Sequence, residues 1–263
     1  MLDAATWITL AAVAPPALCA ALLVWFERRA VRHPWAPVAA MAWGVAVAGF
    51  LAAPVNDWLI AMLVAQAGDP AGHALASRFG GPLVEELLKG LGLVVLLAIR
   101  PDALRSARDG ALLGALIGLG FELVENQHYL TLAAVQAGTA GIVRGVWVRG
   151  ILGGLKHAVF TATTGAGLGW AREATSMRAR LFVPLVAFAA AVVQHAVWNT
   201  VASQAITDAL CAATGPDAAC EVAPPASALY LSVPLIVAVC IAPGIVGLAF
   251  ALRRSDANTA RTS

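Results

Sequence analysis

The segment GPLVEELLKG, residues 81–90, places Glu85, Glu86 and Lys89 at the start of a long apolar run. An ionised side chain in a membrane-spanning helix costs roughly 2.5–3.5 kcal/mol on insertion scales. Side chains three or four positions apart share one face of a helix, so Lys89 can reach either glutamate. We therefore expect these charges to face the protein interior and to serve a site.

Three later apolar runs carry further polar residues at helical spacing. In chain order they are Glu122, Glu125 and Asn126, then Lys156, His157 and Thr161, then Gln194, His195 and Asn199. A helix rises about 1.5 Å per residue. Counted from the ends of the membrane spans predicted below, the acids, imidazoles and amides of the four runs fall at a similar depth, in the outer half of the bilayer. The sequence therefore predicts one buried polar site shared by four helices.

These residue types could hydrolyse a peptide bond without a serine or cysteine nucleophile. A carboxylate can act as a general base that takes a proton from the attacking water. Either Glu85 or Glu86, with Glu125 across a helix interface, would supply this base. Lys89 would pair with whichever glutamate of its own helix stays ionised.

The histidine motifs suggest complementary roles and also an alternative. His195 and Asn199 suit an oxyanion site, and His157 could orient the water or protonate the leaving amine. The set of Glu86, Glu125, His157 and His195 would also be acceptable to zinc or iron. A lysine one turn from Glu86 would repel a dication, so we expect catalysis without a metal or another cofactor.

The composition points to a polytopic membrane protein. Hydrophobic residues make up 60% of the 263 residues, charged residues 12%, and the mean hydropathy is +0.80. Soluble domains carry about 25% charged residues, and disorder requires low hydrophobicity. The net charge of +2, without a basic patch interleaved with aromatics, excludes nucleic acid as a partner.

Seven apolar runs are long enough to span a bilayer, which takes about 20 residues. They cover residues 5–26, 35–57, 80–99, 110–134, 150–170, 181–203 and 227–252. The second run can continue to residue 66, with a break expected at residues 54–57 because of Pro54. We expect an all-α bundle of about seven transmembrane helices, forming a single domain over residues 1–263 with its motif-bearing core at 80–203.

Arginines alternate between the two sides of this predicted topology. One side holds Arg28, Arg29, Arg32, Arg100, Arg105, Arg108, Arg172, Arg178, Arg180, Arg253, Arg254 and Arg261, and the other holds Arg78, Arg144 and Arg149. The positive-inside rule then places the N-terminus outside and the C-terminus in the cytoplasm. Cys211 and Cys220 would lie in an outer loop, where a disulfide and a pair of free thiols are both open.

Three glycines, Gly110, Gly114 and Gly118, recur every four residues in the fourth run. Small residues at this interval let two membrane helices approach closely. We predict that this face packs against another helix.

The polar motifs resemble those of the PrsW family of intramembrane proteases, within the group that includes the CAAX-processing and bacteriocin-immunity membrane proteases. The EExxK motif stands at residues 85–89, FxxxEN stands at 121–126, and His157 with Thr161 and His195 with Asn199 form the two later motifs. The resemblance covers about residues 80–200. The CAAX-processing relatives carry a histidine at the end of the second motif, where this chain has Glu125, as is usual in PrsW-like sequences.

The resemblance implies an intramembrane endopeptidase of glutamic type in a bacterial plasma membrane, with its base in the first motif. Its substrate would be a membrane protein, and the family suggests an anti-sigma factor. Three other functions stay open: a metal-dependent protease, a non-catalytic member that binds a membrane partner, and a proton-coupled transporter. The transporter would be built from broken helices and inverted repeats, and no internal repeat is visible in the sequence.

Overall fold

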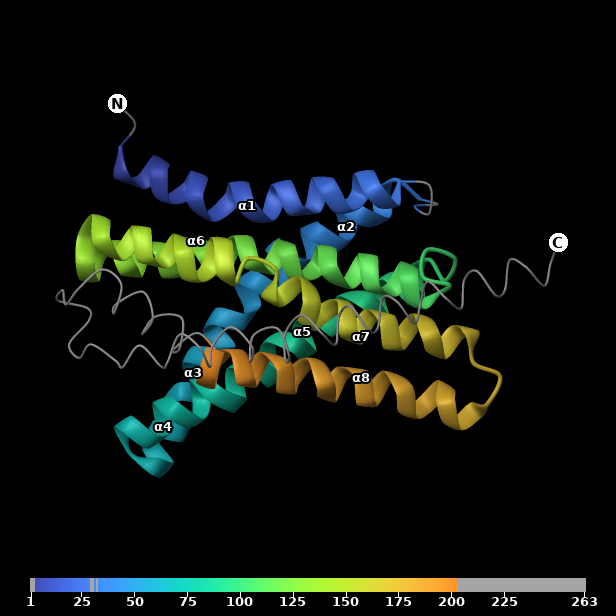
Figure 1. The fold of residues 1–263 in the computed structure, drawn as a ribbon. Helices are drawn as coiled ribbons and strands as arrows, with labels where there is room; N and C mark the ends of the chain where they lie inside the picture. Colours follow the sequence, from blue (N-terminus) through green and yellow to red (C-terminus); the bar gives the residue numbers. More distant parts are fainter. Residues whose placement is uncertain (1–2, 29–30, 32, 203–263) are drawn as a thin grey trace.

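The computed structural model describes residues 3–28, 31 and 33–202, and every regular element in these ranges is helical (Figure 1). The α-helices are α1 (Ala4–Glu27), α2 (Trp35–Trp43), α3 (Phe50–Ala67), α4 (Asp69–Leu75), α5 (Gly81–Ile99), α6 (Ala107–Gly145), α7 (Lys156–Glu173) and α8 (Met177–Val197). The π-helical segments are η1 (Gly44–Gly49), η2 (Ala76–Gly80), η3 (Val146–Leu152) and η4 (Trp198–Ala202). The predicted seventh span, Cys211, Cys220 and the tail arginines lie outside the described residues.

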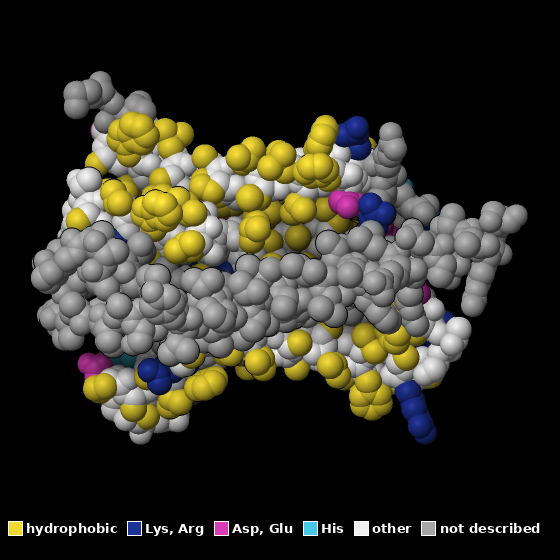
Figure 2. All heavy atoms as spheres, in the orientation of Figure 1, with side chains coloured by type: hydrophobic (Ala, Val, Ile, Leu, Met, Phe, Trp, Pro, Cys, Tyr) yellow, Lys and Arg dark blue, Asp and Glu magenta, His cyan; other side chains and the backbone are white. Residues whose placement is uncertain are grey.

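Three helical stretches are long and apolar enough to cross a membrane: α1, the continuous stretch from α2 to α3, and α8 with η4. Apolar side chains cover much of the visible surface, and Lys and Arg side chains lie mainly at the two ends of the bundle (Figure 2). The described part of the chain is therefore all-helical, with three helical stretches that could cross a membrane. The count of seven spans and the orientation of the termini stay predictions.

The second predicted span continues past Pro54 without the expected break. Pro54 lies inside α3, which runs on to Ala67, and the π-helical η1 precedes it. Proline removes only one backbone donor, and tight packing supports the helix just upstream. A Cβ at Gly44 would collide with the carbonyl oxygen of Ile117, so the backbones of η1 and α6 are in direct contact.

Helices α1, α6, α7 and α8 lie side by side in that order (Figure 1). The predicted glycine face of α6 packs directly on α7. A Cβ at Gly114 would collide with the carbonyl oxygen of Thr161, and one at Gly118 with that of His157. The prediction of close packing is confirmed, and it fixes the height of His157 relative to α6.

Helix α6 is interrupted by a sharp turn at Ala137 and Gly138, where Gly138 has a φ of 55°. A Cβ at Gly141 would collide with the carbonyl oxygen of Ala133, so the last part of α6, residues 139–145, folds back along its first part. This returning segment continues through η3 and is separated from α7 by residues 153–155. The predicted span at 150–170 is thus interrupted near its start. Arg149, predicted at the outer edge of that span, lies on the returning segment.

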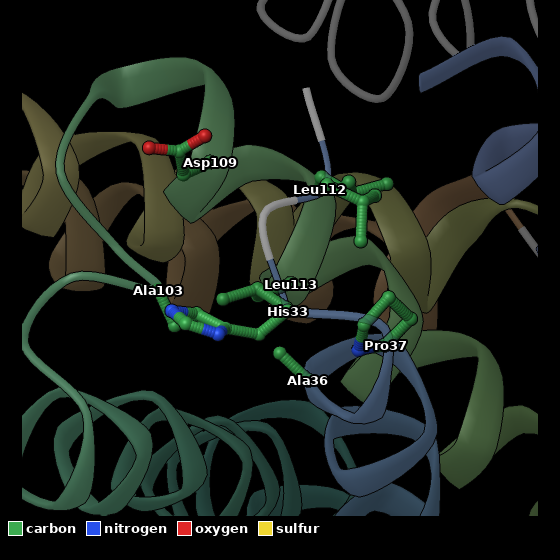
Figure 3. Close-up of a pocket in the computed structure, with 8 residues that line it drawn as sticks. His33, Ala36, Pro37, Ala103, Asp109, Leu112 and Leu113 are labelled. Carbon is green, nitrogen blue, oxygen red and sulfur yellow. The ribbon is translucent and has the colours of Figure 1, made fainter. Parts of the chain in front are cut away.

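The α1–α2 and α5–α6 connections meet at one end of the bundle. Nε2 of His33 lies 2.8 Å from Oδ2 of Asp102, and this hydrogen bond holds the pKa of the Asp102 carboxyl below its usual value. A small pocket beside it is lined by His33, Pro37, Ala103 and Leu113, among others (Figure 3). No residue of the polar motifs lines this pocket, so it is separate from the predicted site.

Candidate active site

The polar motifs of α5, α6, α7 and α8 meet inside the bundle. Their buried members are Glu85, Glu86, Lys89, Glu122, Asn126, Lys156, His157, Thr161, Gln194 and His195. Glu85 retains 8% of its surface, whereas Glu86 retains 1% and Lys89 none. Four helices thus enclose one polar cluster, as the spacing of the motifs predicts.

Glu86 has partners on both carboxylate oxygens. Its Oε1 accepts from Lys89 Nζ at 2.6 Å and lies 3.0 Å from Nδ1 of His195. Its Oε2 accepts from the hydroxyl of Thr161 at 3.2 Å. Lys89 Nζ also lies 2.9 Å from Nδ1 of His157, so this carboxylate is held within a network of three helices.

Glu85 is bound at one oxygen only. Its Oε1 accepts from Nδ2 of Asn56 at 3.1 Å. Its Oε2 is buried and makes no hydrogen bond with any described residue. That oxygen lies 3.6 Å from Nε2 of His195 and 3.9 Å from Nζ of Lys89, both too far for a direct hydrogen bond.

The glutamates of α6 are held by two cations. Lys156 forms an ion pair with Glu122, and Arg149 forms one with Glu125. Nζ of Lys156 is also 3.6 Å from Oε2 of Glu125. That oxygen lies 2.7 Å from Nε2 of His157, so the α6 pair is joined to the α5 pair through one imidazole.

Asn126 and Tyr129 hold Arg149 in place. Nε of Arg149 donates to Oδ1 of Asn126 at 3.2 Å, and its guanidinium lies 4.0 Å from the centre of the Tyr129 ring. The predicted site residue Asn126 therefore supports the arginine that binds Glu125.

The two imidazoles differ in how their nitrogens are engaged. The ammonium of Lys89 has only donors, so Nδ1 of His157 accepts, and its Nε2 carries the hydrogen that Glu125 receives. In His195, Nδ1 contacts Glu86 and Nε2 faces the open oxygen of Glu85. His195 thus offers the imidazole nitrogen nearest to the open carboxylate oxygen.

Asn199 does not join this cluster. Its Nδ2 donates to the backbone oxygen of Ser77 in η2 at 3.0 Å. The prediction rests on α-helical spacing from His195, but the chain is π-helical in η4, from Trp198 to Ala202. A π-helical turn changes which side chains lie above one another, so a residue four positions on turns away.

Glu85, His157 and His195 form a group with metal-binding potential, because one donor atom from each lies within 4.8 Å of the others. The predicted ligand set had Glu86 and Glu125 in place of Glu85. In the structure, Glu86 contacts the other nitrogen of His195, and Glu125 contacts His157. A carboxylate that hydrogen-bonds one ring nitrogen of a histidine commonly orients the other ring nitrogen toward a metal ion.

These features define a helical membrane protein with a buried carboxylate–imidazole centre. Residues 32–239 match the model of a family described as PrsW family intramembrane metalloprotease. The match covers more than half of the chain, which therefore belongs to the PrsW family of intramembrane proteases. Comparison with curated proteins and with solved structures finds no match.

The family description implies a metal ion, and the donors can be tested for their fit to one. Glu85 has a buried oxygen without a hydrogen-bond partner among the described residues, and Glu86 holds the other nitrogen of His195. Two imidazoles and one carboxylate are a zinc-type set. His157 fits this set only if Lys89 leaves its Nδ1. The three residues would hold the ion under that condition.

Two residues of the cluster were missed by sequence reasoning. The sequence alone predicts no role for Asn56, which falls in the expected break at residues 54–57, or for Arg149, which falls at the edge of the span predicted from residue 150. The small residues Gly141 and Gly145 carry the missed signal for Arg149, because they let the returning segment pack against α6. The signal for Asn56 is weaker, since it is a single amide in an apolar run.

Proposed function

We propose that this protein is an intramembrane endopeptidase that cleaves a membrane-protein substrate with a water molecule activated by Glu85. The observation that carries the proposal is the buried, unpaired Oε2 of Glu85, 3.6 Å from Nε2 of His195. A general base must come within hydrogen-bond reach of the proton it takes. Glu86 is a poorer base, since Lys89 and two other donors already occupy its oxygens.

The separation of Glu85 and His195 suits a bridging water. Polar atoms more than about 3.5 Å apart are often joined by one water molecule. Such a water would donate one hydrogen to Oε2 of Glu85 and contact Nε2 of His195. The base and the imidazole would together aim its lone pair at the substrate carbonyl.

Hydrolysis then follows in two steps. The water oxygen bonds to the carbonyl carbon while its proton passes to Glu85, and negative charge develops on the carbonyl oxygen. The tetrahedral intermediate collapses, the carbon–nitrogen bond breaks, and Glu85 returns the proton to the leaving nitrogen. The products are a carboxylic acid and an amine, and Glu85 is a carboxylate again.

The surrounding charges would stabilise this cycle. Lys89, 3.9 Å from Oε2 of Glu85, places a positive charge near the developing oxyanion. His157 is held at both nitrogens by Lys89 and Glu125, which favours a positioning role over proton transfer. The predicted role of Asn199 as an oxyanion donor is weakened by its bond to Ser77.

A metal-dependent protease is the second candidate, favoured by the convergence of Glu85, His157 and His195. A divalent ion held there would act as a Lewis acid toward water or the carbonyl. We favour the glutamate mechanism because Lys89 occupies Nδ1 of His157 and carries a charge that repels a dication.

The substrate and the setting extend the proposal. The distribution of arginines supports an N-terminus outside and a site in the outer half of the bilayer. The family resemblance supports a bacterial plasma membrane and an anti-sigma factor as the substrate.

The test uses purified protein in proteoliposomes with a candidate membrane-protein substrate, in water labelled with oxygen-18. We expect two fragments, with one labelled oxygen in the new carboxyl terminus, and activity that survives exhaustive chelation. Loss of activity on chelation, restored by one particular metal, would make Glu85, His157 and His195 ligands. Proton flux without cleavage of any candidate substrate would favour a transporter, a class that the interruption between η3 and α7 would suit.

A further inference from the structure

Helix α3 contributes one polar contact to the cluster. Ala52 is its only buried residue, so most of α3 faces outward. Asn56 is half-buried and donates from Nδ2 to Oε1 of Glu85 at 3.1 Å. A Cβ at Gly81 would lie 3.7 Å from that oxygen and 3.8 Å from that nitrogen, so this glycine borders the contact.

Asn56 makes the one hydrogen bond that Glu85 receives from the described residues. The amide uses only its donor end, because its Oδ1 is buried without a hydrogen-bond partner in the same ranges. A purely structural asparagine would be expected to pair at both ends, since buried polar atoms are seldom left unpaired. If the Asn56 amide were turned the other way, its Oδ1 would face Oε1 of Glu85, and two acceptor oxygens repel each other. The carboxylate of Glu85 therefore fixes the orientation of the Asn56 amide.

Lys89 competes for the same carboxylate. It lies four residues after Glu85 in α5, and its Nζ is 3.9 Å from Oε2. An ammonium has three donors, and Glu86 and His157 occupy two of them. A small rotation of the Glu85 side chain would give the third donor to Oε2 and close the oxygen that faces His195.

We propose that Asn56 is a positioning residue that holds Glu85 away from Lys89 and keeps Oε2 turned toward Nε2 of His195. This inference rests on the proposed role of Glu85 as the base. Asn56 lies 29 residues before Glu85, the start of the first of the four sequence motifs. It acts through Glu85 and makes no contact with substrate.

The experiment compares Asn56→Leu, Asn56→Ala and Asn56→Gln with the wild type in the proteoliposome cleavage assay. We expect kcat to fall about 10²-fold in the Leu and Ala variants, the loss that a misplaced catalytic group causes, while KM stays unchanged. Asn56→Gln keeps an amide donor on a longer side chain and should recover part of kcat. Asp57→Leu, a polar-to-apolar change at the exposed next residue, is the matched control and should keep wild-type kcat.

The variants also separate positioning from stability. Ala removes the amide without adding bulk, so it guards against misfolding caused by Leu, and activity is normalised to folded protein. Wild-type kcat in both Asn56→Leu and Asn56→Ala, with Glu85→Gln inactive, would overturn this inference and leave the proposed function standing. An active Glu85→Gln variant would overturn the proposed function itself. A rise in KM with unchanged kcat would make Asn56 a substrate contact and would also overturn the inference.

Discussion

The polar cluster contains two glutamate pairs, each on a single helix, and their charges are balanced differently. On α5, Glu85 and Glu86 share one cation, Lys89. On α6, the second pair has two cations, Lys156 from α7 and Arg149 from the returning segment. With neutral imidazoles, the first group carries one excess negative charge and the second group carries none.

The open oxygens of the two pairs illustrate this difference. Oε2 of Glu122 also has no hydrogen-bond partner among the described residues, but its other oxygen pairs directly with the ammonium of Lys156. The other oxygen of Glu85 receives only a neutral amide hydrogen from Asn56. An unbalanced buried carboxylate is unfavourable, and such groups in membrane helices mark functional sites. The proposed function accordingly makes the α5 pair the reactive half of the cluster and the α6 pair its support.

The largest effect on stability is expected from Lys156→Met. Removing one partner of a buried ion pair costs about 3–5 kcal/mol, because the other charge is left uncompensated. We expect the free energy of unfolding in detergent to fall by about this amount, and the double variant Glu122→Gln/Lys156→Met to recover most of it. An unchanged free energy of unfolding in the single variant would show that Lys156 does not balance the charge of the glutamates on α6.

A smaller loss is expected from Gly118→Ala, where the new methyl group would collide with the backbone of His157. Overpacking of this kind costs about 1–3 kcal/mol. Gly90→Ala on α5 is the matched control, because its nearest neighbour, in Thr164, lies at an ordinary 3.8 Å. Equal unfolding free energies for the two variants would mean that the α6–α7 contact is not the tighter one.

The meeting of four helices could be predicted from the sequence, because spacings of three and four residues place each set of polar groups on one helix face. The four-residue glycine interval likewise predicted the close contact of α6 with another helix. In the structure, Gly118 packs directly against the backbone of His157 in α7. These features depend on local periodicity, which a sequence displays directly.

The balance of charges could not be predicted, since it depends on segments without periodic signals. Arg149 reaches Glu125 only because the chain reverses at Gly138. Asn56 comes from a helix without a recognisable motif, and Asn199 turns away because the chain becomes π-helical. Each of these placements is decided by tertiary packing or by a local change in helix type.

The most direct test of this comparison measures Glu85→Gln and Glu122→Gln in one cleavage assay, with activity expressed per folded molecule. Both variants remove one negative charge with little change in size. We expect Glu85→Gln to lose about 10²–10⁴-fold in kcat, the range for a missing general base, while Glu122→Gln keeps wild-type kcat and loses stability. Equal losses of kcat in the two variants, or a larger loss in Glu122→Gln, would contradict the assignment of the open carboxylate of Glu85 as the base.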